Sequence, residues 1–130
     1  MYQLKKAPLF EDDLELLDES GVVNQTIHVS LHLDDLLGRY NETINALRAA
    51  EDAVQPENEA SMEAYGEIVM QLLRLIFREN ADVILTHYEG RYLSMLEQVM
   101  PYILDVIGPK LREMSRRRIA SMKAARRDAV

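Results

Sequence analysis

The chain contains no cysteine and no tryptophan, and only five glycines and four prolines interrupt its 130 residues. Without cysteine, disulfides, thiolate metal sites and cysteine nucleophiles are excluded, and the composition fits a reducing cytoplasm. No apolar run approaches the roughly 20 residues of a membrane span, and the first residues lack the apolar core of a signal peptide. Hydrophobic residues still make up 48% of the chain, so we expect one cytoplasmic domain with its own core.

Positive charge is scarce over most of the chain and gathers at its end. The net charge is −7 at pH 7, but residues 110–130 hold eight basic residues against two acidic ones, a local net charge of +6. Residues 1–109 therefore carry −13. Nucleic acid, anionic lipid or an acidic surface of a second copy could each attract the basic end. We expect a homo-oligomer.

Two short runs predict an N-terminal β-hairpin over residues 13–33, preceded by a flexible lead of residues 1–12. The run VVNQTIHVSLHL alternates apolar and polar residues, which is typical of a strand with one buried face. The tight turn is expected at Glu19–Gly21, because glycine accepts a positive φ. The residues predicted to face apolar surface are Val23, Ile27, Val29, Leu31 and Leu33.

Apolar residues recur at helical spacing after the hairpin and predict a helical core over residues 34–107. A polar stretch at residues 53–61, which contains Pro56, separates a first helix from a second. The second helix is apolar over a broad face and is expected to be central. The fold class is therefore mainly α with a small N-terminal β-hairpin, a compact helical α+β domain.

Several boundaries inside the helical core follow from local signals. Asn80 is predicted to cap a short helix, and Ser94 with Glu97 has the spacing of a capping box. Pro101 is expected to kink the helix that contains it or to restart it. Gly108-Pro109 is expected to break the chain before the last helix.

Residues 109–127 predict a basic C-terminal helix with a narrow apolar edge. This helix can dock to a protein, including a second copy, or it can be a solvated end, a nucleic-acid arm or a membrane-surface helix. It lacks aromatics for base stacking, and its apolar edge is thin for a lipid surface. Removal of residues 110–130 is expected to leave a folded domain unless Leu111 and Met114 complete the core.

The sequence shows no catalytic motif and no Gly-rich cofactor fingerprint, so we expect no enzyme and no cofactor. His28 and His32 share the polar face of the predicted strand, ~13 Å apart, which is too far for one metal ion. His87 is expected to be partly buried or capping. Tyr88 and Tyr92 either pack the short helix onto the next one or form a binding patch with an arginine between them.

One run within residues 72–118 matches a known pattern, YEG-x-Y-x-x-M-L-x-x-x-x-P-[FY]-I. Its members here are Tyr88, Glu89, Gly90, Tyr92, Met95, Leu96, Pro101, Tyr102 and Ile103. On these residues, and in helical layout from about residue 33 onward, the chain resembles the tail assembly chaperones of long-tailed phages and prophages of Gram-positive bacteria.

The resemblance implies a non-catalytic protein of the host bacterial cytoplasm that binds the tape measure protein and tail-tube subunits while the tail forms. The candidate partner-binding residues are Tyr88, Arg91, Tyr92, Arg112, Arg116, Arg117, Arg118, Met122 and Lys123. The alternative is a small helical nucleic-acid-binding or regulatory protein that uses its basic C-terminal helix.

Overall fold

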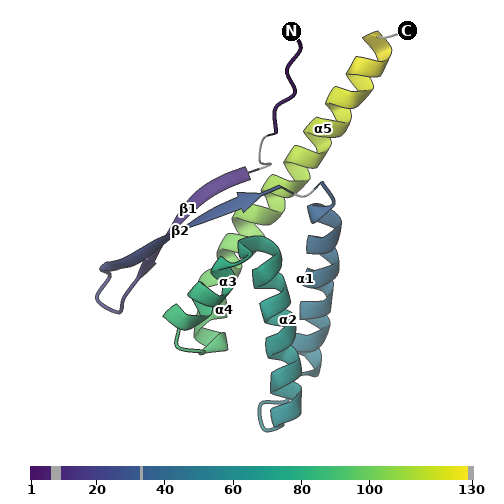
Figure 1. The fold of residues 1–130 in the computed structure, drawn as a ribbon. Coiled ribbons are helices and arrows are strands. Elements are labelled where there is room, and N and C mark those ends of the chain that lie inside the picture. Colours follow the sequence, from purple (N-terminus) through teal and green to yellow (C-terminus); the bar gives the residue numbers. More distant parts are fainter. Residues whose placement is uncertain (7–9, 33, 129–130) are drawn as a thin grey trace.

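The computed structural model describes residues 1–6, 10–32 and 34–128 and shows a mainly helical protein with an N-terminal two-stranded hairpin, as the sequence predicts (Figure 1). The elements in chain order are β1 (Phe10–Leu17), β2 (Val23–Leu31), α1 (Leu36–Ala53), α2 (Glu59–Phe77), α3 (Asn80–His87), α4 (Tyr92–Tyr102), the π-helix η1 (Ile103–Ile107) and α5 (Gly108–Asp128).

The hairpin pairs β1 with β2 in antiparallel register, with a bulge between Leu16 and Leu17. On β2 the predicted apolar face is buried at Ile27, Val29 and Leu31. Val23 is the exception, with 45% of its surface exposed, because it lies past the bulge near the turn. Leu33 lies outside the described residues.

The predicted lead of residues 1–12 is too long, because β1 already begins at Phe10. Residues 1–6 have no regular structure. The Tyr102 hydroxyl of α4 donates a hydrogen bond to Asp12 Oδ2 at 2.9 Å, and the Tyr102 ring stacks on Phe77 with 6.3 Å between centroids. Burial and this hydrogen bond raise the pKa of Tyr102. A contact from a distant helix thus ties down part of the predicted lead.

Helices α1 and α2 lie side by side and antiparallel, and α2 carries the largest share of the core (Figure 1). Most of the periodic apolar positions are buried on both helices, whereas Leu37 and Met62 are only half-buried. The buried ones are Leu36, Tyr40, Ile44 and Leu47 on α1, and Tyr65, Val69, Leu72, Leu73 and Ile76 on α2. Asn58 caps α2, because its side-chain oxygen accepts a hydrogen bond from the Ser61 backbone N–H at 3.1 Å.

Two of the predicted helix caps are wrong. Asn80 is the first residue of α3, and its side chain donates a hydrogen bond to the His28 carbonyl of β2 at 3.0 Å. Ser94 lies inside α4, which begins at Tyr92 without a side-chain cap. In the first case the side chain bonds a distant strand residue instead of the N-terminus of its own helix. In the second the helix starts three residues earlier than a capping box of Ser94 and Glu97 requires.

The predicted break at Gly108-Pro109 is also wrong, because the chain stays helical from Tyr92 to Asp128. Pro101 and Pro109 each lack the N–H that an α-helix would use, and the π-helical residues 103–107 lie between them. In this wider turn the Gly108 N–H donates a hydrogen bond to the Ile103 carbonyl, five residues earlier in the sequence. A local change of helix type therefore takes the place of a break.

Tyr40 of α1 packs against this π turn. Its hydroxyl donates to the same Ile103 carbonyl at 3.3 Å, and its side chain is only 3% exposed. A Cβ at Gly108 would lie 2.5 Å from the Tyr40 hydroxyl oxygen, closer than packed atoms come. Glycine at position 108 thus lets Tyr40 of α1 approach the start of α5 closely.

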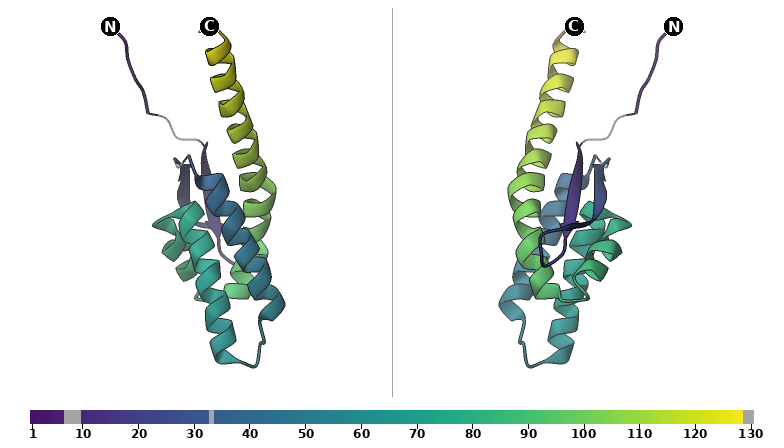
Figure 2. Two further views of the ribbon diagram at one scale, coloured as in Figure 1. Left: turned by 90° about the vertical axis from the view of Figure 1, so that its right-hand side faces the viewer. Right: turned by 90° about the vertical axis from the view of Figure 1, so that its left-hand side faces the viewer.

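Helix α5 begins in the core and ends in solvent (Figure 2). Leu111 is 2% exposed and completes the core, so removal of residues 110–130 takes away a core side chain. From Arg116 to Arg127 every residue is exposed. Residues 116–127, called the tail below, run past the rest of the helical body in every view (Figures 1 and 2).

Candidate functional site

The tail presents both charge and apolar surface. Ile119 is 53% exposed and Met122 57%, and six basic residues surround them. Positions 116, 119, 123 and 126 follow helical spacing, so Arg116, Ile119, Lys123 and Arg126 share one face. A solvent-exposed helix with an apolar centre and a basic rim is suited to contact with an acidic protein surface.

Some of the predicted partner-binding arginines are already engaged within the chain. Arg118 pairs with Asp34 at 2.6 Å, which links α5 to the segment before α1. Arg117 pairs with Glu113 one helical turn back at 2.5 Å. Arg112 is also exposed, and its backbone carbonyl accepts a hydrogen bond from the Arg116 side chain at 3.4 Å. These exposed pairs contribute up to about 1 kcal/mol each and leave the guanidinium groups accessible.

The predicted cluster Tyr88, Arg91 and Tyr92 lies at the α3–α4 turn, away from the tail. Arg91 pairs with Glu89 at 2.9 Å. Tyr92 packs across Gly66 of α2, where an added Cβ would lie 3.2 Å from the Tyr92 ring. Tyr88 is half-buried, and its burial raises its pKa. The structure thus places the predicted partner-binding residues in two separate regions.

An acidic cleft lies between the hairpin turn and the α3–α4 turn, with a volume of about 860 Å³. Its carboxylates are Glu15, Asp18, Glu19 and Glu89, and we call these four residues the acidic notch. The His87 Nε2–H donates to the Leu17 carbonyl at 2.9 Å and holds the hairpin beside α3. His87 is partly buried, as the sequence predicts.

The hairpin turn that forms one wall of the cleft is held by its own residues. Asp18 Oδ1 accepts hydrogen bonds from the backbone N–H groups of Ser20 at 2.8 Å and Val22 at 3.0 Å. Gly21 supplies the positive φ of +84° that the turn requires. The turn leaves Leu17, Val22 and Val23 between 45% and 60% exposed, so the acidic notch has an apolar edge.

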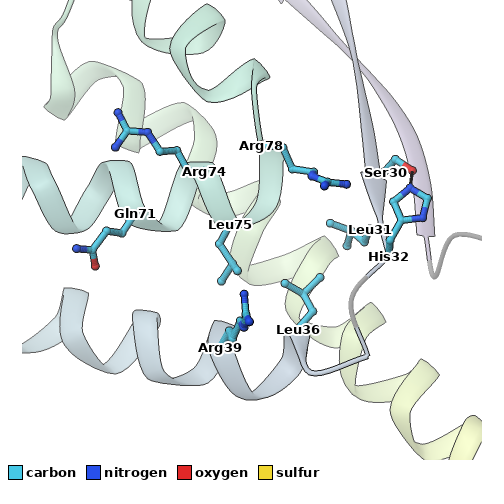
Figure 3. A pocket seen from close by; sticks show the side chains of 9 residues that line it. All are labelled: Ser30, Leu31, His32, Leu36, Arg39, Gln71, Arg74, Leu75 and Arg78. Atoms are coloured by element: carbon cyan, nitrogen blue, oxygen red, sulfur yellow. Dashed lines mark hydrogen bonds between the residues drawn. The ribbon is translucent and has the colours of Figure 1, made fainter.

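A second cleft, basic and floored by leucines, lies between β2, α1 and α2 and has a volume of about 360 Å³ (Figure 3). Arg39 pairs with Asp35 at 2.9 Å and Arg74 with Asp82 at 3.7 Å. Arg78 ends α2 with φ +56° and ψ −125°, a conformation that is strained for a residue with a side chain. In Figure 3 its guanidinium extends toward Ser30 on β2.

His28 on β2 and His32, the residue after β2, face solvent, as predicted. His28 Nδ1 lies 2.7 Å from Asp13 Oδ1 across the hairpin, and its Nε2 lies 3.5 Å from Glu11. The hydrogen bonds to Asp13 and then Glu11 raise the pKa of His28. His32 Nε2 lies 2.6 Å from the Ser30 hydroxyl. Within the described residues, no group of three or more His, Cys, Asp or Glu side chains is placed to hold a metal ion.

The acidic notch and the basic cleft are the features that sequence reasoning missed. Each combines segments that are far apart in the sequence: residues 15–24 with 87–98 in the notch, and residues 30–39 with 71–78 in the cleft. The available signals were the acidic turn DES and the arginine spacing in LLRLIFR, and neither identifies its partner segment.

Comparison of the chain with models of protein families, with curated proteins and with solved structures found no match. Of the helices in the described ranges, none combines the length and the apolar character needed to cross a membrane.

Proposed function

We propose that this chain is a non-catalytic tail assembly chaperone that binds the tape measure protein and tail-tube subunits during phage tail morphogenesis in the bacterial cytoplasm. The observation that carries the proposal is the tail, a helix of which every residue from Arg116 to Arg127 is exposed. It offers Ile119 and Met122 within a basic surround. An extended helical client needs such a helix-sized contact surface.

The resemblance to tail assembly chaperones supplies the identity of the client, and the structure gives its residues specific positions. Met95, Leu96 and Ile103 of the shared run are buried core residues. Glu89 and Gly90 make the α3–α4 turn, where both have positive φ. The shared run therefore maps onto the framework that supports α5, and the contact with the client is assigned to the tail.

The test is co-expression of the full chain with a segment of tape measure protein, measured as the soluble, co-purifying fraction of that segment. Reversal of three tail charges, Arg116→Glu, Arg117→Glu and Arg118→Glu, is expected to lower this fraction severalfold. The matched control reverses three exposed basic residues elsewhere, Lys5→Glu, Lys6→Glu and Arg48→Glu, with the same change in net charge. The control is expected to behave as the wild-type chain does.

Two results would contradict the proposal. One is full retention of the tape measure segment by the tail variant. The other is tight binding of duplex DNA whose affinity falls steeply with salt, with a slope of several released counterions, which would favour a nucleic-acid-binding function instead.

A further inference from the structure

The tail and the acidic notch are oppositely charged surfaces that one copy of the chain cannot bring together. The tail leaves the body at one end of α5, whereas the hairpin turn and the α3–α4 turn lie at a distance from it in each view (Figures 1 and 2). The tail is part of one continuous helix from Tyr92 onward, so it cannot fold back without breaking that helix. A contact between the two surfaces must therefore join two copies.

We propose that the tail of one copy docks into the acidic notch of a second copy, so that the chains associate head to tail. The contact is heterologous, because each copy contributes a different surface, and repetition of it generates either a closed ring or an open row.

The charges of the two surfaces are complementary and available. Arg116, Lys123 and Arg126 on one tail face form no ion pair among the described residues. In the notch, the Glu15 and Glu19 side chains are exposed and likewise form no ion pair within the described part of the chain. Opposite potentials of this kind align two surfaces and suppress the alternative arrangement of like charge against like charge.

The apolar parts also correspond. The turn beside the notch exposes Leu17, Val22 and Val23, and the same tail face exposes Ile119, with Met122 next to it. Contact between the two surfaces would remove these exposed apolar side chains from water. Exposed apolar side chains that lie together are unusual on a monomer. The tail is about 18 Å long, at 1.5 Å per residue, so it spans several side chains of the notch.

The experiment uses the purified full chain and measures its mass in solution at micromolar concentration, at low and at high salt. Wild type is expected to form species larger than a dimer at low salt and to dissociate as salt screens the charges. The tail variant Arg116→Glu, Lys123→Glu, Arg126→Glu is expected to remain a monomer of 15.0 kDa.

The notch variant Glu15→Lys, Glu19→Lys, Glu89→Lys is also expected to be monomeric. Asp18 is left unchanged because its carboxylate holds the turn. For each variant the association constant is expected to fall at least about tenfold, since three charges of one surface change sign and oppose like charges on the other.

The decisive sample is a one-to-one mixture of the tail variant and the notch variant. Each reversed tail then matches the reversed notch of the other protein, and each native tail matches the other's native notch. The mixture is therefore expected to regain the wild-type size although neither component assembles alone. The matched control reverses three exposed acids elsewhere, Glu42→Lys, Glu63→Lys and Glu67→Lys, and is expected to keep assembling.

The proposal is overturned if wild type stays at 15.0 kDa under all these conditions, if either variant assembles alone, if the mixture does not, or if the control loses assembly as fully as the notch variant. It does not depend on the tape measure protein, because the measurement needs only this chain. A chain that self-associates as described but retains no tape measure segment would refute the proposed function and leave this inference standing.

Discussion

The contact between Tyr40 and Gly108 predicts that one substitution, Gly→Ala, has opposite effects at two helical positions. In α1, an added Cβ at Gly38 would meet nothing within 4 Å. Gly38→Ala is therefore expected to stabilise the fold by about 0.5–1 kcal/mol, because alanine loses less conformational entropy in a helix. At Gly108 the same Cβ would lie 2.5 Å from the Tyr40 hydroxyl oxygen and 3.0 Å from its ring carbon Cζ.

The magnitude at position 108 follows from two opposing effects. Helix propensity favours alanine by up to about 1 kcal/mol, whereas overpacking a buried contact costs about 1–3 kcal/mol. The clash decides the sign, because Tyr40 is 3% exposed and a shift of its ring would strain its hydrogen bond to the Ile103 carbonyl. We expect Gly108→Ala to lower the free energy of unfolding by about 1–2 kcal/mol, or about 3–10 °C in melting temperature for a chain of this size.

The assay is thermal and urea unfolding followed by circular dichroism, with Gly38→Ala as the matched control. The single variant Tyr40→Phe is measured as well. The double variant, Tyr40→Phe with Gly108→Ala, removes the hydroxyl that the new methyl group meets. Its loss of stability is expected to be smaller than the sum of the two single losses, which is the coupling that a double-mutant cycle measures. Equal or higher stability of Gly108→Ala relative to wild type would refute the packing argument.

Three further predictions concern the caps, the hairpin and the tail. Asn58→Ala is expected to cost about 1 kcal/mol by unfolding measurements, because it removes the cap of α2; an unchanged midpoint contradicts this. His28→Gln is expected to lower the melting temperature more at pH 5.5–6 than at pH 9. The folded-state pKa of His28 lies above its usual value of 6.5, so the stability it gives is present below that value and is lost as the pH rises through the folded pKa. A difference in melting temperature that does not change with pH would contradict this. Removal of residues 116–130 is expected to leave the melting temperature within a few degrees of wild type. Removal of residues 110–130 is expected to lower the free energy of unfolding by about 2–5 kcal/mol, because Leu111 is lost from the core. Equal effects of the two truncations would contradict this.

Local patterns in the sequence were sufficient to predict the hairpin and the two main helices. Alternation identifies the buried face at Ile27, Val29 and Leu31, since strand side chains repeat with period two. Helical periodicity identifies the cores of α1 and α2 for the corresponding reason. These predictions succeed because burial of one face is a regional property, to which each residue of the element contributes.

The features that could not be predicted depend on single contacts between distant residues. Tyr102 holds Asp12 from 90 positions away, which extends β1 into the predicted lead. Tyr40 binds the Ile103 carbonyl from 63 positions away, at the π turn that replaces the expected break at Gly108. Such contacts leave no periodic pattern in the sequence. Glycine and proline could therefore be interpreted only by their usual local effects on the backbone.

The same limit applies to the candidate sites. The sequence shows the basic end of the chain, since the charge is contiguous, but the acidic notch exists only because His87 holds the hairpin turn beside α3, across 70 positions. Glu89 belongs to the notch although its sequence neighbours indicated only a turn. A surface that is assembled from two segments becomes visible only when both are placed.

The continuity of α4, η1 and α5 explains how the tail stays helical although all its side chains are exposed and its ion pair with Asp34 contributes little. An isolated helix shorter than about 12–15 residues is marginal in water, because nucleation is unfavourable. The tail needs no nucleus of its own, because it extends a helix that is already packed from Met95 to Leu111. Its helical state is therefore sensitive to a break inside the tail, whereas the stability of the body does not depend on the tail.

Ala120→Pro tests this argument, because it breaks the tail without changing its charge. Proline at an exposed helix interior costs about 3 kcal/mol, more than a marginal helical end can offset, so residues beyond position 120 are expected to unravel. Circular dichroism should show less helix, while the melting temperature of the body stays within about 1–2 °C of wild type, since Ala120 is exposed. Because a helical face arranges Ile119, Lys123 and Arg126 together, self-association should fall although every charge remains. Undiminished assembly of Ala120→Pro would show that charge alone, without the helix, is sufficient.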